Sequence, residues 1–234
     1  MSLFDVKGVR EDFPILNEGV IYLDSAASSL TPEQVVLKEM EFYRHYRANV
    51  ERGVHRFSQK ASEEYERAHM DVARFIGAPG PENVAMMRNT TEGINLVANS
   101  LDWTKKDKIV TTVIEHHSNF ITWLRVGKRY GTKIEVVKSD SSGVFDMGDF
   151  EKAVDDRTKL VAVTHVSNVL GCIVPIKEIC EIAHSHGAMM LVDGAQGVPH
   201  IKTDVKDSGV DFLAFSGHKM LGPTGSGGLY ISDA

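Results

Sequence analysis

The stretch Phe215-Ser216-Gly217-His218-Lys219 places a lysine in a turn of small residues, directly after the apolar segment 210–215. A free lysine amine has a pKa of about 10.4, so useful neutral amine near pH 7 requires partial burial or a nearby cation. The apolar segment could supply that burial. Lys219 is therefore a candidate nucleophile, although taken alone it fits the more common pattern of a solvated loop charge.

A second feature lies upstream, where the apolar segment 188–192 is typical of a buried parallel strand and is followed by Asp193. An aspartate at the carboxyl end of such a strand faces the crevice where open α/β sheets bind ligands. Read alone, Asp193 is more often a turn or helix-cap residue. Paired with a lysine that binds an aldehyde, it predicts pyridoxal 5′-phosphate (PLP), whose pyridine nitrogen needs an anionic partner.

The phosphate of that cofactor needs donors, and the segment after the short apolar strand 84–87 offers them. Thr90 and Thr91 stand where a helical pattern begins, so the free N–H groups and the dipole of this helix would attract an anion. An ordinary helix N-cap, formed by Thr or Asn, explains the same segment equally well. His218, beside the candidate lysine, could donate to the same phosphate.

The triplet Glu115-His116-His117 ends the apolar strand 108–113 and enters a helix that runs to about Tyr130. Neighbouring histidines point in different directions on a helix or a strand, so these two cannot easily hold one ion. The other histidines lack the i, i+4 spacing with a carboxylate that zinc hydrolases use. We therefore expect no metal site, and a role for one histidine in covering an aromatic ring.

From residue 84 onward, predicted strands alternate with predicted helices, which indicates an α/β fold with a mostly parallel (mixed) sheet and helices on both faces. The predicted strands are 84–87, 108–113, 133–137, 160–164, 188–192, 212–215 and 228–231. Two helices are expected before them, at 32–46 and 58–75. Thr31 is the expected N-cap of the first, with Pro32 at its first helical position, and Gly131 and Gly187 are expected helix C-caps.

Composition is that of an ordinary globular protein: 234 residues, 42% hydrophobic and 25% charged, enough to bury a sizeable core. The net charge of −6 argues against a nucleic-acid partner. Two cysteines, no signal-like N-terminus and no apolar run near 18 residues predict a cytoplasmic protein with no membrane segment.

Seven separated motifs, in order over nearly the whole chain, resemble the class V aminotransferase family. More narrowly, they resemble its group II cysteine desulfurases, of the SufS-like and selenocysteine lyase type. The motifs are Asp24 to Ser28, Arg52-Gly53-Val54-His55, Thr90 to Asn95, Glu115-His116-His117, Thr164 to Gly171, Val192 to Gln196 and Ser216-Gly217-His218-Lys219.

The resemblance implies the large domain of a fold-type I PLP enzyme, with Lys219 and His116 as catalytic residues. Lys219 would bind the cofactor aldehyde and later move the substrate α-proton, His116 would stack on the ring, and Asp193 would hold the pyridinium nitrogen. The remaining implied cofactor contacts are Asn168 and Gln196 near the ring hydroxyl, and Thr90, Thr91, Ser216 and His218 at the phosphate.

The activity implied by the resemblance is conversion of L-cysteine to L-alanine, with the sulfur passed to an enzyme cysteine as a persulfide for iron–sulfur cluster assembly. It also implies a homodimer and a possible sulfur-acceptor protein. Two alternatives stay open. One is a selenocysteine lyase or another class V enzyme using the same lysine and aspartate, and the other is a non-catalytic cofactor- or partner-binding fragment.

The chain departs from the family pattern at its end, because it stops at Ala234 where family members continue into a smaller domain. That domain normally carries the nucleophilic cysteine and the arginine that clamps the substrate carboxylate. We therefore expect an N-terminal arm (1–19), a PLP-binding large domain (20–234), no small domain in this chain, and little activity from it alone.

Two smaller departures concern cysteines and one loop. Cys172 and Cys180 both lie away from the position of the family nucleophile, and the spacing around Cys180 is typical of core packing in an amphipathic helix. Glu51 stands before Arg52 where relatives often have histidine. An active-site role for that loop is therefore not predicted.

Overall fold

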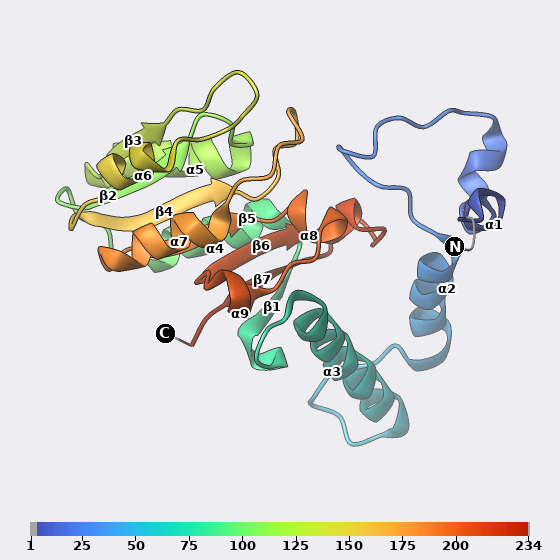
Figure 1. Cartoon of the computed structure of the whole chain (residues 1–234). Coiled ribbons are helices and arrows are strands. Elements are labelled where there is room, and N and C mark those ends of the chain that lie inside the picture. The colour runs from blue at the N-terminus through green and yellow to red at the C-terminus, as the bar shows by residue number, and fades with distance from the viewer. Residues whose placement is uncertain (1–3, 234) are drawn as a thin grey trace.

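A seven-stranded sheet forms the centre of the computed structural model, which describes residues 4–233 (Figure 1). The strand order is β1-β7-β6-β5-β4-β2-β3. Strands β3, β2, β4, β5 and β6 are parallel, whereas β7 pairs antiparallel with both β6 and β1. The strands are β1 (Val84–Met87), β2 (Lys108–Thr112), β3 (Lys133–Val137), β4 (Thr158–Thr164), β5 (Met189–Asp193), β6 (Phe212–Ser216) and β7 (Gly227–Ile231). The predicted mostly parallel, mixed sheet is confirmed.

Helices cover both faces of the sheet because both faces of its strands are apolar. In β4, for example, Leu160 and Ala162 pack toward α4 (Thr90–Ser100) and α5 (His117–Tyr130). The alternate residues Val161 and Val163 belong to the cluster on the other face. That second cluster is covered by α3 (Arg56–Ile76), α6 (Met147–Ala153) and α7 (Ile176–Ser185). The sheet is thus the middle layer of three.

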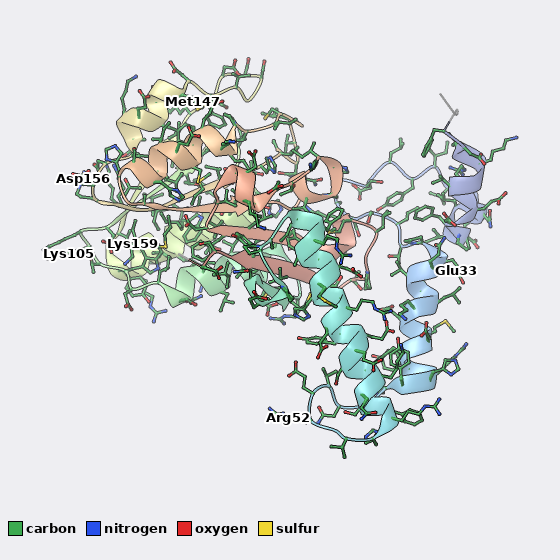
Figure 2. All side chains as sticks on the ribbon, turned by 60° about the horizontal axis from the view of Figure 1, so that its bottom comes forward. Glu33, Arg52, Lys105, Met147, Asp156 and Lys159 are labelled. Carbon is green, nitrogen blue, oxygen red and sulfur yellow. The ribbon has the colours of Figure 1, made fainter. Side chains whose placement is uncertain are left out.

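The N-terminal part of the chain lies on the side of the molecule away from β2 and β3 (Figure 1). It comprises α1 (Val6–Glu11), a 3-10 turn (Pro14–Glu18) and α2 (Glu33–Glu41), which continues as a π-helical turn (Phe42–Tyr46) before α3. In Figure 2, Arg52 marks the tip of the hairpin between this turn and α3. Within residues 4–233, no helix is both long and apolar enough to cross a membrane.

The start of α2 differs from the prediction. Helix α2 begins at Glu33 with Pro32 in the cap position, in extended geometry and without a side-chain cap. The predictions of Thr31 as the N-cap and of Pro32 as the first helical residue are therefore both wrong. The Thr31 hydroxyl instead donates to the carbonyl of Gly222, at 3.4 Å. This contact across 191 residues takes the side chain away from the helix and ties the N-terminal segment to the loop after Lys219.

The two glycines predicted as helix C-caps have left-handed backbone conformations, which glycine adopts without steric strain because it has no Cβ. Gly131 is the C-cap of α5 with φ 76°, which confirms that prediction. Gly187 has φ 71°, but it follows the residue that caps α7, His186. The predicted boundary is therefore displaced by one residue there.

The parallel strands bring four polar residues to one edge of the sheet. Thr112, Thr164, Asp193 and Ser216 are the last residues of β2, β4, β5 and β6. Thr164 is paired with Asp193 in the register of β4 and β5. The carboxyl edge of such a sheet is where α/β proteins bind ligands.

Of two short helices after β5, α8 (Gly197–His200) is packed tightly against this edge, and α9 (Val205–Ser208) precedes β6. A Cβ added at Gly197 would lie 2.5 Å from Nδ1 of the buried His165. The backbone N–H of His165 in turn donates to the carbonyl of Asp193, at 2.9 Å. Glycine at this position thus permits the close approach of α8 to the residue that supports Asp193.

We expect Gly197→Ala to destabilise the chain by about 1–3 kcal/mol, because the imidazole of His165 would have to move within a packed region. Chemical denaturation measures the free energy of unfolding. Gly148→Ala is the matched control, since its added Cβ would meet nothing closer than 3.3 Å, at Oδ1 of Asp146, within α6. Equal stability of Gly197→Ala and the unmodified chain would contradict the packing described.

Candidate active site

One cavity of about 500 Å3 lies at the carboxyl edge of the sheet, and all nine residues predicted as site residues line it. They are Thr90, Thr91, His116, Asn168, Asp193, Gln196, Ser216, His218 and Lys219. The other lining residues are Asp24, Ala26, Ala27, Asn89, Ser118, Thr164, Val166 and Ala195. The fold thus collects residues from six separate chain segments around one space.

Lys219 is the last residue of a 3-10 turn (Gly217–Lys219) that follows β6 directly. The turn is fixed by backbone hydrogen bonds from Gly217 N–H to Ser226 O and from Gly222 N–H to Gly217 O, both 2.8 Å. Partial burial lowers the pKa of Lys219 below its usual 10.5, and the negative charge of Asp193 opposes that shift. The predicted desolvation of this amine is therefore present, and it favours a nucleophilic, neutral form.

Asp193 ends β5 and is only 3% exposed. Its Oδ1 accepts a hydrogen bond from the backbone N–H of Ala195 at 3.0 Å. Burial raises the pKa of Asp193, while that N–H and the charges of Lys219 and His116 act in the opposite direction. A buried carboxylate with little local compensation is a site that would bind a cationic group.

The start of α4 contributes the second wall of the cavity. Asn89 caps the helix by accepting the N–H of Glu92, at 2.9 Å. The Ser216 hydroxyl accepts the N–H of Thr90 at 2.9 Å and lies 2.7 Å from the Thr90 hydroxyl. The segment is an ordinary helix N-terminus, because Asn89 is the N-cap. Thr90 and Thr91 also line the cavity, so an N-cap here is compatible with a phosphate-binding role.

His116 and Ser118 lie together at the start of α5. His116 is the N-cap, and its Nδ1 accepts the N–H of Ser118 at 3.2 Å. The Ser118 hydroxyl lies 3.0 Å from the same Nδ1 and 2.8 Å from the Thr91 hydroxyl. Because Nδ1 is an acceptor, the ring proton of neutral His116 belongs on Nε2. The imidazole is exposed on the cavity, where it can cover a planar ligand.

The N-terminal segment closes another side of the cavity. The side-chain amide of Gln196 donates to the carbonyl of Ala26 at 2.6 Å, and the carbonyl of His218 accepts the backbone N–H of Ser29 at 2.8 Å. The Ser28 hydroxyl lies 3.3 Å from Nδ1 of His218. Burial, with the charge of Lys219, lowers the pKa of His218.

Three other groups lie outside the cavity. Cys180 is buried, donates to the carbonyl of Gly209 at 3.2 Å, and has a pKa raised by burial to about 12, so its thiol is unreactive. Cys172 is partly exposed and does not line the cavity. The loop that holds Arg52 is likewise absent from the lining. In the part of the chain from residue 4 to 233, no group of three or more His, Cys, Asp or Glu residues is arranged to hold a metal ion.

Sequence reasoning named no role for Ser118 or Thr164, which also line the cavity. Thr164 had a usable signal, because it ends a predicted buried strand as Asp193 does. Ser118 had none beyond its position next to the histidine pair. Asp24, Ala26 and Ala27 belong to one of the motifs of the family resemblance, but no role in the cavity was predicted for them.

The lowered pKa of Lys219 predicts that its amine becomes reactive at a lower pH than the 10.5 of an ordinary lysine. Asp193→Asn should lower further the pH at which Lys219 is half deprotonated, because it removes the negative charge that favours the ammonium form. The pH dependence of acylation at Lys219, followed by mass spectrometry of the peptide, measures both midpoints. A Lys219 midpoint at or above 10.5 would contradict the description of a desolvated amine.

Comparison with known proteins shows the family of the chain. Residues 21–234 match the family model described as aminotransferase class-V. The chain is 48% identical over 230 residues to a probable cysteine desulfurase of Halalkalibacterium halodurans, covering 95% of this chain and 57% of the relative.

Two solved structures are similar as well. The apo structure of a cysteine desulfurase from Thermococcus onnurineus has a TM-score of 0.92 and 47% identity, covering 99% of this chain and 58% of that one. The cysteine desulfurase CsdA from Escherichia coli has a TM-score of 0.87 and 36% identity, covering 99% and 59%. The chain thus spans somewhat more than half the length of these relatives, which are PLP-dependent enzymes. It belongs to the class-V aminotransferase family.

Proposed function

We propose that residues 20–234 form the PLP-binding large domain of a cysteine desulfurase, preceded by an arm at residues 1–19. The observation that carries this proposal is the placement of Lys219 and Asp193 on one cavity at the carboxyl edge of the sheet. Burial favours a neutral amine at Lys219, and the buried Asp193 carboxylate is poised for a cation. These are the two groups that PLP chemistry requires of a protein.

The residues present fit this cofactor at its ring nitrogen and at its phosphate. Within residues 4–233, Oδ1 of Asp193 has a backbone donor and Oδ2 has no hydrogen-bond partner, so Oδ2 is available to a pyridinium N–H. The start of α4, an 11-residue helix, supplies a dipole and the hydroxyl of Thr91 for a phosphate. When bound, PLP supplies the electron sink that stabilises negative charge at the substrate α-carbon.

Each residue of the cavity wall would have a separate role toward bound PLP. Lys219 Nζ would bind the cofactor aldehyde and, once released by substrate, would carry the substrate α-proton. His116 would cover one face of the ring and exclude water from it. Thr90, Ser216 and His218 would complete the phosphate contacts with Thr91, and Asn168 and Gln196 would lie near the ring hydroxyl, as their places in the cavity wall allow.

We propose L-cysteine as the substrate of the whole protein, with alanine and protein-bound sulfur as products. One structural neighbour is described as being in complex with cysteine. On the resemblance alone, we also propose a cytoplasmic homodimer that passes sulfur to an acceptor protein for iron–sulfur cluster assembly. The nucleophilic cysteine would come from the smaller domain of longer relatives, since neither Cys172 nor Cys180 lines the cavity.

Titration of the purified chain with PLP, followed by visible absorption, tests the cofactor part of this proposal. We expect a saturable new band that differs from free PLP, and a linear response equal to free PLP would overturn it.

Alanine release from L-cysteine tests the proposed reaction and the proposed source of the nucleophilic cysteine. We expect little release from this chain alone, and robust release would contradict the assignment of the nucleophile to a segment outside it.

A further inference from the structure

Glu115 lies in the short connection between β2 and α5, one residue before His116, and its carboxyl group is held by donors from three elements. Oε1 accepts the hydroxyl of Thr112 at 2.5 Å and the backbone N–H of Thr164 at 2.9 Å. Oε2 accepts the side-chain amide of Asn119 at 2.6 Å. Glu115 therefore joins the ends of β2 and β4 to the first turn of α5.

The donors around Glu115 are themselves buried. Thr112 and Asn119 are fully buried, and Thr164 is 5% exposed. Oδ1 of Asn119 accepts the indole N–H of the buried Trp123 at 3.0 Å. Because an indole nitrogen can only donate, the amide orientation of Asn119 is determined, and its NH2 group must face Glu115.

This network ends at the cavity on two sides. Thr164 lines the cavity and is paired with Asp193 in the sheet. His116 follows Glu115 directly, so the place of its imidazole depends on how the connection before α5 is anchored. Burial and the nearby Asp193 charge raise the pKa of Glu115 to about 8, against the effect of its three donors. A polar group in such surroundings is costly unless all of its hydrogen bonds are made.

We propose that Glu115 is a positioning residue that holds His116 over the cofactor cavity by anchoring the start of α5 to the ends of β2 and β4. The inference rests on the proposed function, because it concerns the ring that His116 would cover. Glu115 itself does not line the cavity, so it acts through His116 and not on the cofactor.

Three variants separate positioning from other effects. Glu115→Gln keeps the shape but offers one acceptor oxygen, so its NH2 group must face either the donors at Oε1 or the NH2 group of Asn119. Adding Asn119→Asp restores a complete set of hydrogen bonds, because the new carboxylate at position 119 accepts both the indole N–H of Trp123 and the amide introduced at position 115. Glu151→Gln, which replaces an exposed carboxylate on α6, is the matched control.

Two readouts are needed besides thermal unfolding. The first is the 15N resonances of the His116 imidazole in the cofactor-free chain, and the second is the dissociation constant for PLP from absorption titration. We expect Glu115→Gln to shift the His116 resonances and to weaken PLP binding up to about tenfold, the effect of losing one hydrogen bond of ordinary strength. The double variant should recover both values, and Glu151→Gln should change neither.

Glu115→Gln with unshifted His116 resonances would overturn the inference, even if the variant unfolds at a lower temperature, because the network would then be structural only. A double variant that recovers thermal stability but not the His116 resonances would overturn it as well. If the unmodified chain does not bind PLP, the proposed function fails, whereas the His116 resonances still decide whether Glu115 positions this ring.

Discussion

Lys219→Ala is expected to abolish retention of PLP after gel filtration, whereas the unmodified chain should keep the cofactor and its visible absorption. The reason is chemical, because no other described lysine lines the cavity and a covalent bond to Nζ would be the strongest single attachment of the cofactor. The half-buried amine, with its lowered pKa, is the group prepared for that bond.

The matched control is Lys202→Ala, which removes an exposed lysine. It should retain as much PLP as the unmodified chain. Circular dichroism of Lys219→Ala should be unchanged, because removal of a partly buried amine leaves the core intact. Retention of PLP by Lys219→Ala at the level of the unmodified chain would show that a different residue, or no residue, forms the covalent attachment.

Asp193→Asn is expected to weaken PLP binding by about 100-fold or more, because breaking one partner of a buried charge pair costs about 3–5 kcal/mol. The stability of the cofactor-free chain, in contrast, should not fall in this variant. Burial raises the pKa of Asp193, so its carboxyl group favours folding at low pH and loses that contribution as pH rises through the folded-state pKa. Asparagine has no charge to desolvate, so the variant should be at least as stable near pH 8.

Two measurements on Asp193→Asn therefore distinguish a ligand-binding role from a structural one. Absorption titration gives the dissociation constant for PLP, and denaturation at pH 8 gives the free energy of unfolding without it. Asp207→Asn, which removes an exposed partner of Lys177, should leave both values unchanged. Unaltered PLP binding, or strong destabilisation of the cofactor-free Asp193→Asn chain, would contradict the role assigned to this carboxylate.

The part of the fold that was predicted from the sequence is the part determined by local apolar patterns. Strands buried on both faces, such as 188–192, are continuous apolar runs, and their alternation with helices indicates a parallel sheet. The site followed from the same logic, because Asp193 and Ser216 end parallel strands and must therefore meet at one edge. The family resemblance added the roles of these residues.

What the sequence did not show depends on contacts between distant segments. Gln196 donates to the carbonyl of Ala26, 170 residues away in the sequence. Thr31 donates to the carbonyl of Gly222, 191 residues away, and does not cap α2. The hydrogen bonds of Glu115 are similar, since its partner Thr164 lies 49 residues away. No periodicity or local propensity encodes such pairs. The N-terminal motif 24–28 was recognised in the sequence, but its place in the cavity wall became visible only in the folded chain.

Borohydride reduction of the chain incubated with PLP, followed by mass spectrometry of its peptides, tests the proposed cofactor site most directly. The reduced cofactor should be found on the peptide that contains Lys219, in near-stoichiometric amount, and should be missing from that peptide in Lys219→Ala. Adducts spread over exposed lysines, with none enriched at Lys219, would contradict the assignment of this cavity as a PLP site.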